Sequence, residues 1–374
     1  MAGMLPRLLC AASVSVFSLH SWHSHTLHST TKCDDDANSL INSIGNTPLI
    51  LLSSLSKETG CLIYGKAEWM NPTGSVKDRA AKMIIKEAEQ NGLITPGKTI
   101  LIEGTGGNTG IALAQIARSK GYSFITVMPN CIGPEKILLQ ERLGAKIHLQ
   151  PLVPYTNPLN YARYAETLGK ELENGFHTNQ FENTANFRAH YSETGPEIYR
   201  QTQGKVDAFV CSAGTGGTIA GITAFLKEVK PSVKTFLIDP DGSCLYEYLT
   251  NNVLKSSGSS FIEGIGIGRI TKNFSQAKID HALRGSDREA VEMAYYLMRE
   301  EGIYLGSSAA LNVVGAVKVA KKLGPGHVVV TILCDSGERY VSKLYNKEWL
   351  EQQNLLPTTP TENTKSLSFI QVDK

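Results

Sequence analysis

Lys77 is the side chain whose type and position suggest covalent chemistry. It lies in residues 71–79, which read NPTGSVKDR, at the expected start of a helix. A helix N-terminus carries partial positive charge, which disfavours an ammonium group and favours the free amine. A free amine is the form of lysine that attacks a carbonyl carbon to form a Schiff base. A single lysine is most often a solvated surface residue, so the other motifs must decide its role.

Two segments rich in glycine and threonine could bind an anion. Residues 103–110 read EGTGGNTG and residues 212–218 read SAGTGGT, and each follows an expected strand and opens an expected helix. The start of a helix presents unpaired N–H groups, and glycine lets the backbone approach a ligand closely. Each loop alone also fits a structural turn, but two loops at matching junctions favour a phosphate or carboxylate ligand.

The second loop does not have the spacing of a dinucleotide-binding fingerprint. If Gly214 and Gly216 are its first two glycines, the third required position is Ile219, and no lysine of the phosphate-loop type follows either segment. Asp239 ends the next expected strand, where an acid that binds ribose would lie. The failed spacing argues against a nicotinamide-dependent enzyme.

These loops need a parallel sheet to position them. Apolar runs predict strands, and segments with a 3.6-residue period predict helices between them. Alternation of this kind indicates an α/β fold with parallel sheets covered by helices and with sites at the carboxyl ends of strands. The expected strands are residues 99–103, 124–128, 208–212, 235–239 and 328–334, and the expected helices are residues 78–90, 109–120, 217–227 and 288–301.

The 374 residues are enough for two cores, so we expect two domains. The predicted division is a leader over residues 1–34, an N-terminal α/β domain over 35–189, a C-terminal α/β domain over 190–355 and a flexible tail over 356–374. The N-terminal domain would hold Lys77 and the first glycine loop. The C-terminal domain would hold the second glycine loop.

Charge and cysteine usage exclude several classes of function. The net charge of +2 comes from Arg7 and Lys32, which leaves 35 basic and 35 acidic residues in the rest of the chain. A neutral body argues against binding to nucleic acid or a membrane surface. The seven cysteines form no CxxC pair, and the four histidines between residues 20 and 28 lack partnering ligands, so we expect no metal site.

The leader sequence predicts import of the protein into an organelle. Residues 1–33 contain no acid and place apolar residues on one helical face, which is typical of a transit peptide. Its longest apolar stretch, residues 8–19, is too short to span a membrane. We expect a mitochondrial protein, in the matrix or associated with the outer membrane, with a cytoplasmic or a secreted protein as alternatives.

The order and spacing of the motifs resemble fold type II pyridoxal-phosphate enzymes. The motifs are PTGSVKDR with Lys77, EGTGGNTGIALA, TNQFEN with Gln180, GTGGT, EGIGIGR and CDSGERY. The chain resembles most closely the cysteine synthase and cystathionine β-synthase family, in particular its fungal mitochondrial branch, over residues 40–351. The resemblance implies two α/β domains like those of the tryptophan synthase β subunit, bound pyridoxal 5'-phosphate and a homodimer.

The resemblance also implies roles for single residues. Lys77 would hold the cofactor covalently and move the substrate α-proton, Asn108 would bind the ring hydroxyl oxygen, and Ser336 would face the pyridine nitrogen. A neutral hydroxyl there suits β-elimination better than transamination. The cofactor phosphate would be bound by Gly214, Thr215, Gly216, Gly217 and Thr218. The substrate carboxylate would be bound by Thr105, Gly106, Gly107, Thr109 and Gln180.

The implied reaction is β-replacement, which forms L-cysteine from O-acetyl-L-serine and sulfide. One departure is Gly106, which stands where the family usually has a serine, so one hydrogen bond to the substrate would be missing. A second is Ala309, where the family commonly has glycine. The alternatives are a cystathionine β-synthase, a serine or threonine dehydratase, and a non-catalytic regulator that binds the cofactor.

Overall fold

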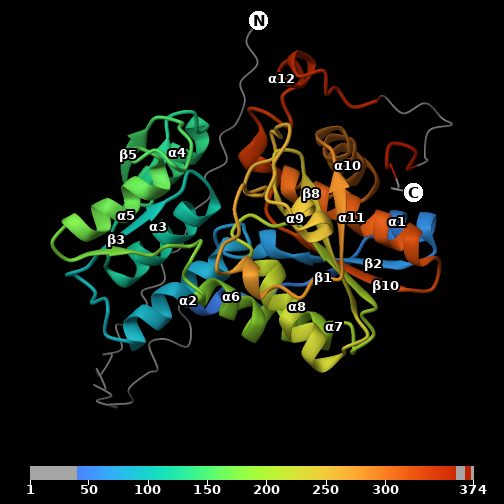
Figure 1. Cartoon of the computed structure of the whole chain (residues 1–374), viewed down its shortest axis with the longest axis horizontal. Helices are drawn as coiled ribbons and strands as arrows, with labels where there is room; N and C mark the ends of the chain where they lie inside the picture. Colours follow the sequence, from blue (N-terminus) through green and yellow to red (C-terminus); the bar gives the residue numbers. More distant parts are fainter. Residues whose placement is uncertain (1–39, 359–366, 372–374) are drawn as a thin grey trace, which may run out of the picture. The chain divides into compact units, whose positions relative to one another are not determined.

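Strands form two sheets in the computed structural model, which describes residues 40–358 and 367–371 (Figure 1). The expected leader and its histidines lie outside these residues. The larger sheet has the order β1-β2-β10-β7-β8-β9, and every pair except β1–β2 is parallel. Its strands are β1 (Leu49–Leu51), β2 (Leu62–Ala67), β7 (Ala208–Cys211), β8 (Lys234–Pro240), β9 (His281–Gly285) and β10 (Val328–Leu333).

The smaller sheet is parallel throughout, with the order β5-β4-β3-β6. Its strands are β3 (Ile100–Gly104), β4 (Ser123–Pro129), β5 (Lys146–Gln150) and β6 (Gly175–His177). Parallel strands need crossover connections, and the helices between them supply these. The expected α/β fold of mostly parallel sheets covered by helices is therefore confirmed.

The expected helices are present with ends that differ by one or two residues. They are α2 (Lys77–Gln90), α3 (Asn108–Lys120), α8 (Gly217–Val229) and α10 (Asp287–Glu300). The other α-helices are α1 (Ser53–Thr59), α4 (Pro134–Arg142), α5 (Tyr161–Glu171), α6 (Ala185–Ala189), α7 (Gly195–Gln201), α9 (Leu245–Asn251), α11 (Ser307–Leu323) and α12 (Lys347–Gln352). Short 3₁₀ turns are η1 (Leu40–Ser43), η2 (Glu68–Met70), η4 (Phe274–Gln276) and η5 (Gly337–Tyr340), and η3 (His190–Thr194) is a π-helical turn. Within the described part of the chain, no helix is both long and apolar enough to cross a bilayer.

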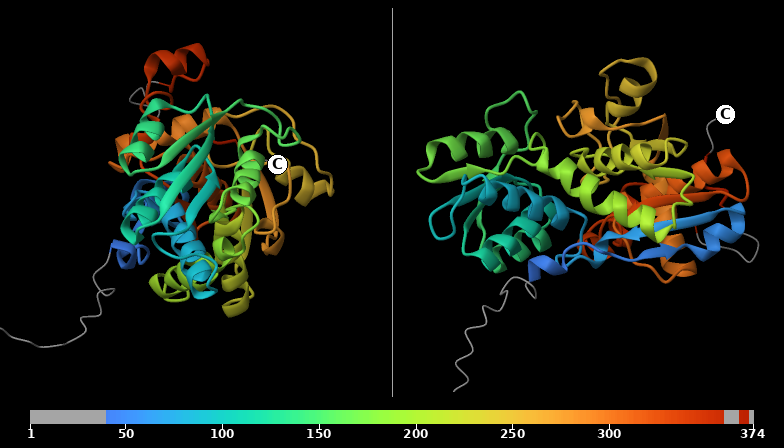
Figure 2. Two further views of the ribbon diagram at one scale, coloured as in Figure 1. Left: turned by 90° about the vertical axis from the view of Figure 1, so that its left-hand side faces the viewer. Right: turned by 90° about the horizontal axis from the view of Figure 1, so that it is seen from below.

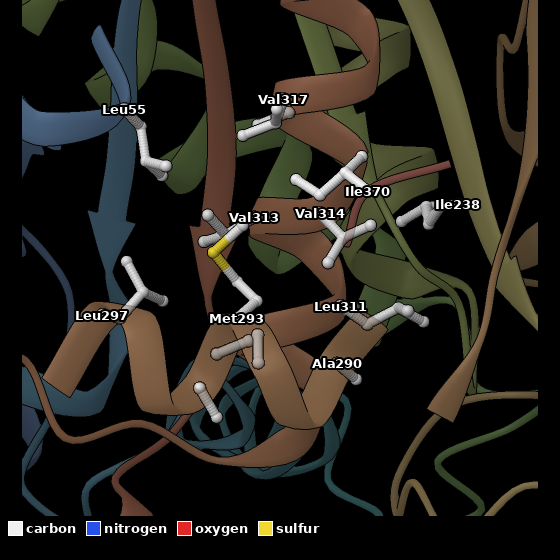
Figure 3. Close-up of a cluster of buried hydrophobic side chains, with 14 of the residues drawn as sticks. Leu55, Ile238, Ala290, Met293, Leu297, Leu311, Val313, Val314, Val317 and Ile370 are labelled. Atoms are coloured by element: carbon white, nitrogen blue, oxygen red, sulfur yellow. The ribbon is translucent and has the colours of Figure 1, made fainter. Parts of the chain in front are cut away.

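The core of the larger sheet is built around α11. Its first fourteen residues are all buried and most of them are apolar, as expected of a helix inside a protein. Val313, Val314 and Val317 lie among side chains of α1, β8 and α10 (Figure 3). Leu367 and Ile370 are also buried in this cluster, so the predicted flexible tail is packed against the core at these two positions.

The chain's first strands join the sheet formed by its last ones. β2 pairs in parallel with β10, with Leu62 opposite Val328, and β1 pairs with β2. Residues 49–67 therefore belong to the same sheet as residues 208–333, although the predicted N-terminal domain spans 35–189. By their contacts, the described residues form one unit. The proposed boundary at residue 189 thus remains a prediction.

A buried ion network attaches α2 to the larger sheet. Arg79 donates to Glu68 (Nε to Oε2, 2.7 Å) and to Glu197 of α7 (Nη1 to Oε1, 2.7 Å). Lys66 of β2 donates from Nζ to Oε2 of Glu197 at 2.5 Å. Each buried charge has partners of opposite sign, which is the condition under which burial is tolerated. The network fixes the first turn of α2.

The pKa of Glu197 gives a test of this network. Burial alone would raise it, but the hydrogen bonds and charges of Arg79 and Lys66 outweigh burial and lower it to about 2. A depressed carboxyl pKa stabilises the fold above the unfolded value of 4.5 and loses that contribution as pH falls toward 2. We therefore expect Glu197→Gln to cost most stability above pH 5. The difference in free energy of unfolding from wild type should shrink by about 1 kcal/mol per pH unit below 4.5.

Urea unfolding between pH 6 and pH 3.5 measures this difference. Lys170 and Glu166 form an exposed pair on α5, so Glu166→Gln is the matched control, with little change in stability expected. A difference between wild type and Glu197→Gln that stays constant with pH would contradict the assigned pKa.

Candidate active site

Lys77 is placed by backbone pairing with the end of β10. The N–H of Val76 donates to the carbonyl oxygen of Cys334 at 2.9 Å, and Ser75 forms an isolated antiparallel bridge with Asp335. Lys77 is then the first residue of α2, as expected. No described residue accepts a hydrogen bond from its Nζ. The lysine is therefore held by its backbone while its amine has no hydrogen-bond partner in the described protein.

The loop between β7 and α8 forms the opposite wall of a pocket. Gly216 has φ +86°, and a Cβ atom at this position would lie 2.7 Å from the backbone nitrogen of Phe274. Glycine is thus required both by the left-handed conformation and by the close approach of residue 274. α8 begins at Gly217 and directs the first N–H groups of the helix toward the loop.

The pocket brings together Lys77 and the second glycine loop, which lie about 140 residues apart in the chain. Its lining includes Lys77, Ser212, Gly214, Thr215, Gly216 and Thr218 together with Val76, Cys211, Ala213, Ile219 and Cys334. Burial raises the pKa of the Cys334 thiol to about 12, and it raises that of Cys211 as well. Both thiols are therefore neutral and act as apolar wall. The Ser212 hydroxyl oxygen is buried without a partner.

The residues expected to bind the substrate carboxylate lie outside this lining, on the first glycine loop and at Gln180. Thr109 donates from its hydroxyl to Oε1 of Gln180 at 2.6 Å, and Gln180 N–H donates to the buried carboxylate of Glu103 at 3.0 Å. Thr105 accepts from Gly107 N–H at 3.2 Å. Thr109 and Gln180 are thus adjacent, as members of one subsite must be. Their role in binding a substrate carboxylate stays a prediction.

Asn108 is bound to two side chains of the β10–η5 region. Its Nδ2 donates to Oδ2 of Asp335 at 2.7 Å, and its Oδ1 accepts from Arg339. Asp335 also accepts from the Tyr340 hydroxyl at 2.7 Å. To bind a ring oxygen, Asn108 would have to exchange one of these partners.

Ser336 does not line the pocket. It is half-buried at the start of η5, where its hydroxyl accepts from Glu338 N–H at 3.4 Å. Ser307, which sequence reasoning missed, has a fully buried hydroxyl without a partner at the first position of α11. Ser336 thus lies outside the pocket lining, as Asn108 and Gly217 do, and its role as a cofactor contact stays a prediction.

The Ile132 side chain lies close to the backbone of Gly106. A Cβ atom at residue 106 would lie 2.4 Å from Cδ1 of Ile132. Ile132 thus occupies the space that the usual serine side chain would need. A serine at position 106 would therefore require the Ile132 side chain to move.

Comparison with known proteins agrees with this geometry. A family described as "Pyridoxal-phosphate dependent enzyme" matches residues 40–335. The chain belongs to this family. It is 52% identical to "Cysteine synthase 1" of Neurospora crassa, over 90% of this chain and 91% of that protein. It is 39% identical to "Putative mitochondrial cysteine synthase" of Saccharomyces cerevisiae, over 90% and 91%.

A solved structure is similar as well. The O-acetylserine dependent cystathionine beta-synthase from Helicobacter pylori has a TM-score of 0.74 and 34% identity, covering 82% of this chain and 97% of that one. The two sheets and their helices therefore have the fold of this family, and the chain's cofactor is pyridoxal phosphate.

The pocket residues fit this cofactor. The unpartnered amine of Lys77 would bind its carbonyl carbon, and the start of α8 with Thr215 and Thr218 would bind its phosphate. The orphaned hydroxyl of Ser212 provides a further polar contact in the same pocket. Pyridoxal phosphate, when bound, supplies an electron sink for chemistry at the α-carbon of an amino acid.

Gly216 allows a test of the loop. Gly216→Ala combines a strained left-handed residue with a clash against residue 274, whereas Gly121→Ala at φ +76° meets nothing within 4 Å. We expect Gly121→Ala to cost about 1 kcal/mol of stability and to leave cofactor binding unchanged. Gly216→Ala should lower cofactor affinity at least tenfold, because the loop must shift. Equilibrium dialysis against pyridoxal phosphate measures this, and equal affinities for both variants would contradict the assignment.

Proposed function

We propose that this chain is a cysteine synthase that forms L-cysteine from O-acetyl-L-serine and sulfide. The observation that carries the proposal is the meeting of the Lys77 amine and the β7–α8 loop in one pocket. Several relatives that align with more than four fifths of the chain are themselves named cysteine synthases, including that of Dictyostelium discoideum at 48% identity.

The residues of the two loops and Lys77 would have different roles in this reaction. Thr109, Gln180 and the N–H groups of the first glycine loop would hold the substrate carboxylate and so orient its α-carbon toward Lys77. The Lys77 amine, once displaced from the cofactor by the substrate amine, would remove the α-proton as a general base. The apolar lining would exclude water from the reacting atoms. Departure of acetate from the β-carbon would then allow sulfide to add there, and Lys77 would return the proton to the α-carbon to give L-cysteine.

Cystathionine synthesis is a second candidate. The similar Helicobacter pylori protein is an O-acetylserine dependent cystathionine beta-synthase, and Apis mellifera "Cystathionine beta-synthase" is 39% identical to this chain. The first half of the reaction would be shared, and only the thiol that adds to the β-carbon would differ. Assays with sulfide and with homocysteine as competing nucleophiles decide between them.

We further propose a mitochondrial homodimer. The acid-free leader supports the location, and one relative from yeast is named as a mitochondrial enzyme. Immunoblots of fractionated cells test the location, and a protein confined to the cytosol would contradict it. Sedimentation of the purified protein tests the dimer, and a monomer at all concentrations would contradict that.

Lys77→Ala tests the catalytic assignment. We expect the purified variant to lose at least a thousandfold in the rate of cysteine formation, because both the covalent anchor and the proton carrier are removed. It should also lose the visible absorbance band of lysine-bound cofactor. Lys82→Ala, five residues further along α2, is the control and should retain both. A normal rate of cysteine formation by Lys77→Ala would contradict the proposal. A wild-type protein that forms no cysteine would favour a regulatory role.

A further inference from the structure

A helical run over residues 185–201 packs directly against α8. It consists of α6, the π-helical turn η3 and α7, and it lies beside α8 in both Figure 1 and Figure 2. A Cβ atom at Gly221 would lie 2.4 Å from the carbonyl oxygen of Phe187, and one at Gly217 would lie 2.1 Å from Oδ1 of Asn186. Two glycines one helical turn apart thus let the run approach α8 closely. Turns of π-helix often occur at functional sites.

Asn186 fixes the orientation of the Thr215 hydroxyl. Its Nδ2 donates one proton to the carbonyl oxygen of Gln180 at 3.1 Å and the other to Oγ1 of Thr215 at 2.9 Å. Because the Thr215 oxygen already accepts, its own proton is available to donate. None of the described residues accepts that proton, and Thr215 lines the pocket.

His190 fixes the orientation of the Thr218 hydroxyl. Its Nδ1 lies 2.9 Å from Oγ1 of Thr194, and its Nε2 lies 3.1 Å from Oγ1 of Thr218. Burial, with the charge of Arg79, lowers the pKa of His190 to about 3, so the ring is neutral with one donor and one acceptor nitrogen. If the proton is on Nε2, Thr194 donates to Nδ1 and Thr218 accepts from Nε2. The hydroxyl proton of Thr218 is then available to a ligand in the pocket. If the proton were on Nδ1 instead, Thr218 would donate to Nε2, and only a lone pair of its oxygen would face the pocket.

We infer that Asn186 and His190 are positioning residues that hold the hydroxyl protons of Thr215 and Thr218 toward the phosphate of the cofactor. Oriented donors bind an anion, while oriented lone pairs repel it. The inference rests on the cofactor site of the proposed function but not on which reaction the enzyme catalyses. It assigns Nε2 as the protonated nitrogen of His190.

Variants of residue 190 test the inference on the cofactor-free protein. His190→Leu removes the donor, and we expect the affinity for pyridoxal phosphate to fall at least tenfold. The affinity for pyridoxal, which has no phosphate, should stay within twofold of wild type. His190→Gln places an amide N–H near the position of Nε2 and should recover most of the loss. Thr223→Val, a buried threonine of α8 whose hydroxyl accepts from Lys278 N–H, is the control and should change neither affinity.

Equal losses for the two ligands would overturn the inference, because a merely structural histidine would affect both. Failure of His190→Gln to recover affinity would also overturn it. A second readout needs no variant: ¹⁵N spectra of the holoenzyme should show His190 protonated on Nε2 at every pH from 6 to 8, and protonation on Nδ1 would contradict the assignment. If cysteine formation were absent while these results held, the proposed reaction would fail and the inference would stand.

Discussion

The hydrogen bond from Val76 N–H to the carbonyl oxygen of Cys334, with the bridge between Ser75 and Asp335, determines where the chemistry can occur. It attaches the residue before Lys77 to the carboxyl end of β10. β10 is the neighbour of β7, and the two strands are parallel, so the loop after β7 opens at the same edge of the sheet. Lys77 and the loop before α8 meet for that reason.

Other contacts keep Lys77 and the β7–α8 loop in this arrangement. Arg79, two residues after Lys77, is joined to Glu68 and Glu197, so α2 cannot rotate without separating buried charges. Gly216, Gly217 and Gly221 let neighbouring segments approach the loop and α8 to distances that any side chain would prevent. The neutral thiols of Cys211 and Cys334 keep the pocket wall apolar. The amine is thus placed by a rigid scaffold in surroundings that contain little competing charge.

Local patterns predicted much of this arrangement. Strands β3, β4, β7, β8 and β10 and helices α2, α3, α8 and α10 follow from apolar periodicity, and the two glycine loops follow from their place after strands. Strands β2, β5, β6 and β9 were not predicted. The pairing of β2 with β10 could not be predicted in this way, because it joins residues more than 260 positions apart. Asn186 and His190 were missed for a related reason: their importance lies in what their polar atoms meet after folding. Burial of Leu367 and Ile370 likewise depends on a core built from distant residues.

Reductive trapping tests the central claim most directly. The holoenzyme would be treated with borohydride, which fixes the cofactor to the amine that holds it, and then digested and analysed by mass spectrometry. The account predicts a phosphopyridoxyl group on Lys77 alone. Its appearance on another lysine, or the absence of any labelled peptide from a protein that retains the cofactor, would contradict the assignment of Lys77.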